Sequence, residues 1–199
     1  MKYFATLPKV VYTDKTGVSK VMTNLMARAS IKPTFLDSPV IYYKYDIQDG
    51  DTPEIIAHKY YGDVYRYWIV LYVNQILDPQ WGWPVTMNTF DSYINDKYSN
   101  INVYNTPHHY EKIITQFDNG TNTTTTHKLV IDEYTYNNLV DSTSTASFPS
   151  GKVTINVTKN VVSLYDYELN LNESKRNINI LNSNYVNQLE TELTDLMAA

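Results

Sequence analysis

Residues 40–62 read VIYYKYDIQDGDTPEIIAHKYYG and contain the clearest succession of secondary-structure signals in the chain. Residues 40–46 are rich in β-branched and aromatic side chains, which is typical of a strand. Asp49-Gly50 then predicts a turn. Asp51 and Glu54 predict the N-terminal cap and capping box of a helix. A strand that leads through a tight turn into a helix is therefore expected here.

A second helix is expected over residues 64–75, directly after Gly62, which suits a left-handed C-cap. Its centre, WIVLYV at residues 68–73, is apolar on every side, which indicates a helix buried against several neighbours. This apolar run is far shorter than the ~20 residues that a membrane span needs. Residues 81–84, WGWP, predict an aromatic turn, and residues 89–98 predict a short amphipathic helix.

The remaining segments give weaker patterns. Residues 1–39 lack sustained periodicity and predict an extended arm, with one short helix at 19–29. Hydrophobic residues recur at helical spacing from Leu169 onward, which predicts an amphipathic helix at the C-terminus. We therefore expect an α+β protein in four parts: an N-terminal arm (1–39), a βααβ module (40–99), a β-rich middle segment (100–167) and a C-terminal helix (168–199).

The middle segment is expected to contain short strands separated by polar loops. Residues 110–117 and 128–132 predict a pair of strands joined by a loop that includes the threonine run after Asn122. Residues 153–157 alternate as a further strand. Residues 141–152, rich in serine and threonine, predict a second loop.

The composition limits the classes of function. The chain has 199 residues, a formal net charge of −5 and no cysteine, which excludes disulfides and thiolate chemistry and suits a reducing cytosol. The sequence contains no basic cluster of the kind that contacts a nucleic acid. No signal peptide is expected at the N-terminus. The 19 tyrosines fit protein interfaces, although a lineage bias toward Tyr and Asn would explain them equally well.

No set of residues predicts catalysis or a bound cofactor. His109 and Glu111 would share one face of a strand, but no third metal ligand has a suitable spacing. Asp49, Asp51 and Glu54 are explained by the turn and the helix cap at which they stand. Phosphate-binding loops, serine-nucleophile elbows and zinc-protease motifs are absent from the sequence. We expect a protein that is not an enzyme and that holds neither metal nor cofactor.

Several motifs in order resemble one protein family. GDTPEIIA at residues 50–57 is similar to the start of the first helix in LysM modules, which bind peptidoglycan or chitin. The continuation closely resembles the LysM-like baseplate wedge protein family of T-even-type contractile-tailed bacteriophages. The segments that carry this second resemblance are YF..LP at 3–8, YRYWIVLYVN at 65–74, ILDP at 76–79, WP at 83–84, F..YI..KY at 90–98, HHYE at 108–111 and YDYE..LNE.KR.I at 165–178.

The resemblance implies a structural subunit of the virion, made in the cytoplasm of the bacterial host and placed in the tail baseplate. Such a subunit links neighbouring wedges around the hub, with several copies in each ring. Its implied partners are the wedge core proteins and the small sheath-like baseplate subunit, with no nucleic acid and no membrane span. The alternative is a LysM-type module that binds peptidoglycan or chitin.

The residues expected to combine core packing with partner contact lie in two groups. An aromatic group belongs to the predicted βααβ module, and a polar group belongs to the C-terminal segment. They are Tyr61, Tyr65, Trp68, Trp81 and Trp83 in the first group and Glu168, Asn172 and Arg176 in the second.

Overall fold

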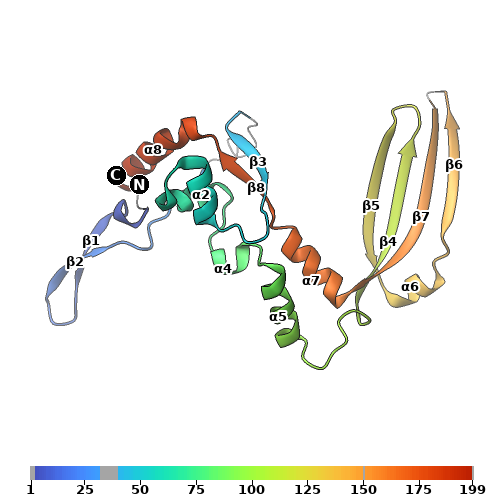
Figure 1. Ribbon diagram of the computed structural model, residues 1–199, viewed down its shortest axis with the longest axis horizontal. Helices are drawn as coiled ribbons and strands as arrows, with labels where there is room; N and C mark the ends of the chain where they lie inside the picture. The colour runs from blue at the N-terminus through green and yellow to red at the C-terminus, as the bar shows by residue number, and fades with distance from the viewer. Residues whose placement is uncertain (1–2, 32–39, 150, 199) are drawn as a thin grey trace. The chain divides into compact units, whose positions relative to one another are not determined.

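The chain forms two compact units, and the predicted α+β class is confirmed because helices and strands occur in both (Figure 1). The structure is a computed structural model that describes residues 3–31, 40–149 and 151–198. Unit 1 contains residues 1–87 and 173–199, and unit 2 contains residues 88–172.

Unit 1 is assembled from both ends of the chain around a two-stranded antiparallel sheet of β3 and β8. Its elements in chain order are η1 (Tyr3–Ala5), β1 (Lys9–Thr13), β2 (Ser19–Thr23), β3 (Tyr42–Asp46), α2 (Pro53–Tyr61), η2 (Val64–Arg66), α3 (Tyr67–Val73), α4 (Pro79–Gly82), β8 (Asn177–Leu181), η3 (Ser183–Tyr185) and α8 (Val186–Ala198). The register of the sheet runs from Tyr42 opposite Leu181 to Asp46 opposite Asn177.

The strand β8 was not expected, since the sequence predicts helix from Leu169 onward. That prediction is wrong over β8, although α8 confirms a helix at the C-terminus. The spacing of Ile178, Leu181 and Tyr185 is that of a helix, whereas Ile178 and Ile180, two residues apart, also fit one side of a strand. Pairing with β3 decides between them, because it buries Ile178 and Ile180 completely or nearly so on one side of the strand.

The turn between β3 and α2 uses the predicted residues in different roles. Thr52, and not Asp51, is the N-cap of α2, and its hydroxyl accepts a hydrogen bond from the Ile55 amide at 3.3 Å. The Asp51 carboxylate instead accepts hydrogen bonds from the Tyr45 hydroxyl at 2.6 Å and from the Gln48 amide at 3.1 Å. Asp51 therefore ties the end of β3 to the start of the helix.

The second helical segment is buried, as its all-round apolar sequence predicts. Gly62 ends α2 with φ 67°, which confirms the expected left-handed cap. The Asp63 carboxylate then accepts a hydrogen bond from the Tyr65 amide at 2.9 Å. The helix is divided into η2 and a shorter α3, in which residues 68–71 are buried together with Val73. These side chains are the centre of the core of unit 1.

The N-terminal segment forms a β-hairpin, so the predicted helix at 19–29 is wrong. β1 and β2 pair antiparallel, with Val11 opposite Val21. The turn between them holds Gly17 at φ 82°, and the Asp14 carboxylate accepts hydrogen bonds from the amides of Thr16 and Val18 at 2.8 and 3.1 Å. This turn favours the strand pairing over the helix that Val21 and Leu25 suggested.

Part of the predicted arm packs on the core of unit 1. Leu7 is buried in the core, and the ring of Tyr3 lies 5.4 Å from the ring of Trp68. The part of the arm at 32–39 lies outside the described residues. The arm is thus attached at its start, before the hairpin begins.

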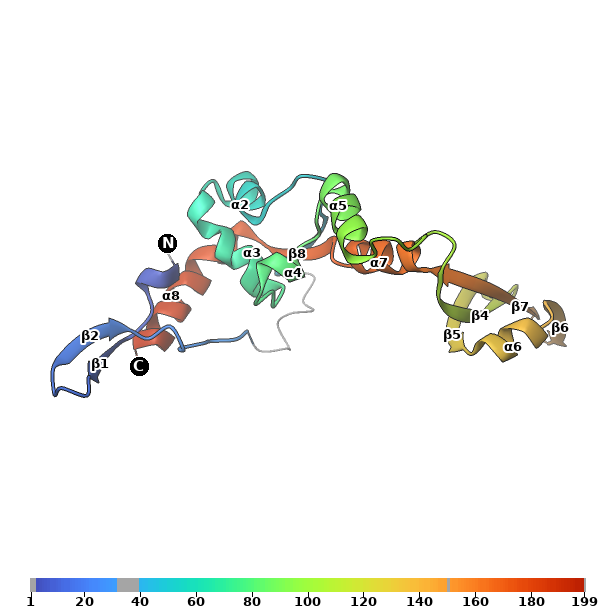
Figure 2. The ribbon, with the colours of Figure 1, turned by 90° about the horizontal axis from the view of Figure 1, so that it is seen from below.

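Unit 2 consists mainly of a four-stranded antiparallel sheet in the order β5-β4-β7-β6. Its elements are most of α5 (Met87–Lys97), then β4 (Pro107–Asp118), β5 (Thr123–Ile131), α6 (Glu133–Asn138), β6 (Ser142–Phe148), β7 (Gly151–Ser163) and most of α7 (Leu164–Glu173). α6 connects the two edge strands and crosses beneath one end of the sheet (Figure 2).

The sheet contains residues that the sequence assigned to loops. The threonine run at 123–126 belongs to β5, and the Ser- and Thr-rich stretch at 142–148 forms β6. The predicted strand at 153–157 is part of the longer β7. Threonine is β-branched and favours strands, so a threonine run between two turns pairs readily when a neighbouring strand is present.

We predict that unit 1 depends on the burial of Ile180 in β8. Ile180→Ala removes a side chain with no exposed surface and should lower the free energy of unfolding by about 2–5 kcal/mol. Chemical denaturation followed by tryptophan fluorescence measures this directly, because Trp68, Trp81 and Trp83 all belong to unit 1.

The matched control is Ile55→Ala, at an exposed isoleucine of α2. It should change the free energy of unfolding by no more than ~1 kcal/mol. Equal effects of the two substitutions would contradict the proposed place of β8 in the core.

Candidate interaction surfaces

The aromatic residues expected at the site divide into buried and exposed members. Tyr61, Trp68 and Trp83 lie in the core of unit 1. Tyr65 and Trp81 are exposed, Trp81 to 64%. Only the exposed members are accessible to a partner, while the buried ones belong to the core. Burial raises the pKa of the Tyr61 hydroxyl, which keeps that group neutral.

Trp83 is held by a hydrogen bond that joins the end of α4 to the start of α2. Its indole Nε1 donates to the Asp51 carbonyl oxygen at 2.9 Å, and 9% of the residue is exposed. Tyr45 donates to the carboxylate of the same aspartate. Burial, followed by this hydrogen bond to the carboxylate, raises the pKa of Tyr45 to about 12. Asp51 is therefore a junction of three elements.

Glu168 is the buried polar centre of unit 2. Its carboxylate accepts hydrogen bonds from the Lys97 ammonium and the Tyr98 hydroxyl, each at 2.7 Å. Burial by itself raises the pKa of a carboxyl, but the two hydrogen bonds outweigh it and the pKa of Glu168 is lowered. The contact fixes α7 to the end of α5 within unit 2.

Asn172 and Arg176 belong to different units. Asn172 is buried on α7 in unit 2. Arg176 precedes β8 in unit 1, where its Nε donates to the Glu173 carboxylate at 2.7 Å and its Nη1 donates to the Ile47 carbonyl at 3.1 Å. Its Nη2 lies 3.9 Å from the Asp49 carboxylate. Arg176 therefore stabilises the β3–β8 pairing.

Asn74 performs a structural role that the sequence did not reveal. Its side-chain amide donates to the carbonyl oxygens of Val70 and Asn179, both at 2.8 Å. Its side-chain oxygen accepts from the Asn179 amide at 2.7 Å. One side chain thus supplies the backbone of β8 with the hydrogen bonds that a further strand would supply. An asparagine directly after a buried helix was the only signal in the sequence.

The segment at residues 108–111, which contains the metal ligands considered above, makes ring and charge contacts. His108 stacks on Tyr167 with ring centroids 3.7 Å apart. His109 Nε2 lies 3.6 Å from the Glu111 carboxylate, which also lies 3.7 Å from the Lys128 ammonium. Among the described residues, no group of three or more histidine and acidic side chains is placed to hold a metal ion.

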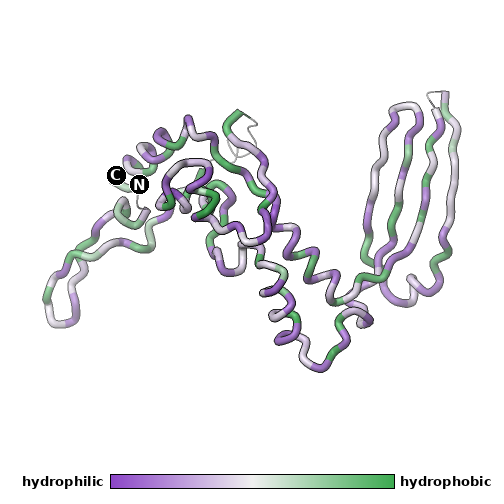
Figure 3. The backbone as a smooth tube through the Cα atoms, in the orientation of Figure 1, coloured by the Kyte–Doolittle hydropathy of each residue, from purple (hydrophilic) through white to green (hydrophobic). Residues whose placement is uncertain are grey.

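The two faces of the sheet of unit 2 differ in polarity, and the register assigns each side chain to a face because directly paired residues point to the same side. The register places most of the isoleucine, leucine and valine side chains on one face, together with Lys112, Lys159 and Thr125, and most of the threonines and asparagines on the other, together with Ile113 and Val130. The alternation is visible along the strands in Figure 3. The apolar face carries Tyr110, Ile114, Leu129, Ile131, Ala146, Phe148, Val153, Ile155, Val157 and Val161.

α6 covers only one end of this apolar face. The ring of Tyr136 packs against Tyr110 with centroids 4.8 Å apart, and Lys159 donates to the Tyr136 carbonyl oxygen at 3.0 Å. Towards the other end, Phe148 is exposed, and Leu129, close to the covered end, is exposed as well. Exposed apolar side chains such as these are suited to contact with another molecule.

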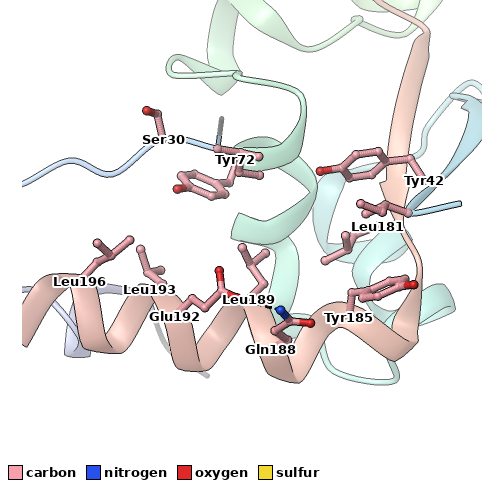
Figure 4. Close-up of a pocket in the computed structure, with 12 residues that line it drawn as sticks. Ser30, Tyr42, Tyr72, Leu181, Tyr185, Gln188, Leu189, Glu192, Leu193 and Leu196 are labelled. Atoms are coloured by element: carbon pink, nitrogen blue, oxygen red, sulfur yellow. Dashed lines mark hydrogen bonds between the residues drawn. The ribbon is translucent and has the colours of Figure 1, made fainter. Parts of the chain in front are cut away.

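A pocket of ≈ 470 Å³ opens in unit 1 between α8 and the β3–β8 sheet (Figure 4). Leu181, Leu189 and Leu193 contribute to its mainly apolar wall. The one acidic side chain in the lining is Glu192, which accepts a hydrogen bond from Gln188 at 2.8 Å. The pocket offers room for apolar side chains but contains no arrangement of reactive groups.

The exposed apolar side chains of both units are of the kind found where proteins contact one another. The comparison with known families agrees, since the family model described as base plate wedge protein 53 of phages matches residues 15–197. The chain belongs to this family, whose members are structural proteins of the phage tail baseplate. A comparison with curated proteins finds no match.

We predict that alanine substitutions of Trp83 and Trp81 affect the free energy of unfolding to very different extents. Trp83→Ala removes a buried ring and its hydrogen bond to Asp51, so the free energy of unfolding should fall by about 3–5 kcal/mol. Trp81→Ala, at the exposed position, should change the free energy of unfolding by less than ~1 kcal/mol. Far-ultraviolet circular dichroism during denaturation provides the comparison; similar losses would show that Trp83 does not anchor the turn.

We predict a pH-dependent role for Glu168. Its lowered pKa stabilises the folded state at pH values above the ordinary carboxyl value of 4.5, and this contribution is lost as the pH falls through the lowered value. Glu168→Gln should therefore cost about 1–2 kcal/mol at neutral pH.

The difference between wild type and Glu168→Gln should shrink below pH ~4, where the wild-type glutamate also becomes protonated. Denaturation at several pH values, followed by circular dichroism because unit 2 contains no tryptophan, measures the difference. A loss that stays constant down to low pH would contradict the ionised contact.

Proposed function

We propose that this chain links neighbouring wedges of the baseplate around the tail hub by binding different neighbours through different surfaces. The family match supports association with other baseplate proteins. The single observation that carries the proposal is that exposed apolar side chains lie on separate elements of both units, with Val11 and Trp81 in unit 1 and Leu129 and Phe148 in unit 2.

Separate surfaces suit a linking subunit in a ring. A subunit that uses one patch against one neighbour and a different patch against another makes heterologous contacts, and such contacts close into a ring when the rotation permits. The proposed neighbours are the wedge core proteins and the small sheath-like baseplate subunit. Tyr65 and Trp81 are the proposed direct contacts of the aromatic group, and its buried members hold their positions.

In this proposal the core of unit 1 is a LysM-like scaffold. Two antiparallel strands, β3 and β8, with two helices, α2 and α3, supply the elements of a βααβ module. The second strand arrives only after unit 2, so unit 2 is an insertion between the helices and the closing strand. Among the described residues, no helix has the length and apolar character needed to cross a membrane.

We predict that the full-length chain, tagged and coexpressed with the other wedge proteins of the same tail, is recovered with them in a complex of fixed stoichiometry. Native mass spectrometry identifies each component. Trp81→Ala should lower the recovery several-fold while leaving the fold intact, because truncation of an exposed aromatic contact removes binding without affecting the core.

The matched control is Ile55→Ala, which truncates another exposed apolar side chain of unit 1 and should leave recovery unchanged. A monomer that ignores the wedge proteins and is retained on purified peptidoglycan would contradict the proposal and would favour the LysM-type glycan binder.

A further inference from the structure

The N-terminal hairpin of β1 and β2 presents apolar side chains on both of its faces. Val11 and Val21 are directly paired and share one face, and Val10 and Met22 are directly paired and share the other. Every residue of both strands is exposed, Val11 to 70% and Val21 to 68%. In both views the hairpin extends away from the other elements of unit 1 (Figures 1 and 2), and Figure 3 marks its hydrophobic stretches.

A two-stranded sheet cannot bury either of its own faces, and an isolated hairpin is only marginally stable in water. Here the turn is nevertheless specified in detail. Asp14 accepts hydrogen bonds from the Thr16 hydroxyl and amide and from the Val18 amide, and these bonds lower its pKa. The Thr13 and Ser19 hydroxyls also lie 3.0 Å apart across the strands. The hairpin is therefore shaped in advance for contacts on two sides.

The charge of this segment is opposite to that of the rest of the protein. Residues 1–31 contain five lysines and arginines and one acidic residue, a net charge of +4, whereas the chain as a whole has a net charge of −5. The remainder therefore carries −9, since −5 − 4 = −9. The one acid, Asp14, is committed to the turn. In the described part of the chain, Lys9, Lys15, Lys20 and Arg28 form no ion pair within the protein.

We propose that the β1–β2 hairpin is a docking arm that inserts into a cleft of a different baseplate subunit, with apolar walls and an acidic rim. Two apolar faces require two walls, and a cleft supplies both where a flat surface supplies one. The three lysines of the hairpin, Lys9, Lys15 and Lys20, favour carboxylates at the rim. This inference rests on the proposed function and identifies the chemistry of one of its partners.

A second copy of this chain is a poorer match for the hairpin. The pocket beside α8 is an apolar cavity in the described part of unit 1, and Glu192 is the one carboxylate in its lining, already hydrogen-bonded to Gln188. One carboxylate does not balance the three lysines of the hairpin. We therefore expect the cleft that receives the hairpin to lie on another subunit.

The test measures binding of the full-length chain to the purified wedge proteins of the same tail, at low and at moderate salt. Val11→Asp places a charge on an apolar face and should weaken binding at least ~10-fold, because that charge would be buried without a partner. Lys20→Glu reverses a charge without touching the apolar contacts. It should weaken binding several-fold and reduce its dependence on salt.

Two matched controls accompany these variants. Val140→Asp changes an exposed valine of unit 2 (78% exposed), and Lys44→Glu reverses an exposed lysine of β3. Both should bind like the wild type. Unfolding curves by tryptophan fluorescence show that each hairpin variant retains its core, and Lys20→Glu tests the proposal independently should Val11→Asp fail to fold.

The outcomes separate this inference from the proposed function. If the wild type does not bind the wedge proteins, the proposed function fails. If the wild type binds and both hairpin variants bind as tightly as the wild type, the inference that the hairpin is a docking arm is wrong and the proposed function stands. The inference is also overturned if the wild type alone forms oligomers that Val11→Asp dissolves. Binding to phosphatidylglycerol vesicles that is lost in both variants, with wedge binding intact, would likewise overturn it.

Discussion

The pairing of β3 with β8 is the constraint on which unit 1 depends. It joins a strand from the first quarter of the sequence to a strand near the C-terminus, with Tyr42 opposite Leu181. Ile180 is fully buried by it. The pairing also continues beyond the sheet, because the Ile47 amide donates to the Arg176 carbonyl at 2.9 Å. Without β8, helices α2 and α3 would lack half of the sheet on which they pack.

This constraint determines how the chain can carry binding surfaces. Since unit 1 closes only when the C-terminal segment returns to it, unit 2 is attached to it at both of its ends, after Met87 and before Glu173. A segment attached twice loses less conformational freedom on binding than a free tail does. The hairpin, in turn, starts directly after Leu7, which is anchored in the core. Unit 2 and the hairpin are thus both attached to the core of unit 1, the part of the protein that tolerates substitutions least.

The local structure of residues 40–84 was predictable from the sequence, because its signals act over a few residues. The strand, the turn and the all-round apolar helix each follow from neighbours in the chain. The N-cap of α2 was harder to predict, because Asp51 and Thr52 both suit that position. In the fold the Asp51 carboxylate binds the Tyr45 hydroxyl, and the Thr52 hydroxyl caps the helix. The long strands of unit 2 were missed in part, since threonine runs favour strands only when a partner strand is present.

Long-range features were not predictable from local patterns. The spacing of Ile178, Leu181 and Tyr185 suits a helix and that of Ile178 and Ile180 suits a strand, and the choice depends on β3, which lies far away in the sequence. Among the candidate site residues, Trp83 and Glu168 could be named from their types and settings. Their partners, the Asp51 carbonyl and the Lys97 ammonium, follow only from the fold. An asparagine directly after a buried helix was likewise visible in the sequence, but its hydrogen bonds to the backbone of β8 follow only from the fold.

The most direct test of this account is electron cryo-microscopy of intact tails from the phage that encodes the chain. The account predicts density for the chain in the baseplate, with β3 paired to β8 in its core and with contacts to at least two different neighbouring subunits. A baseplate that lacks the chain, or one in which it touches a single neighbour through a single surface, would contradict the linking role.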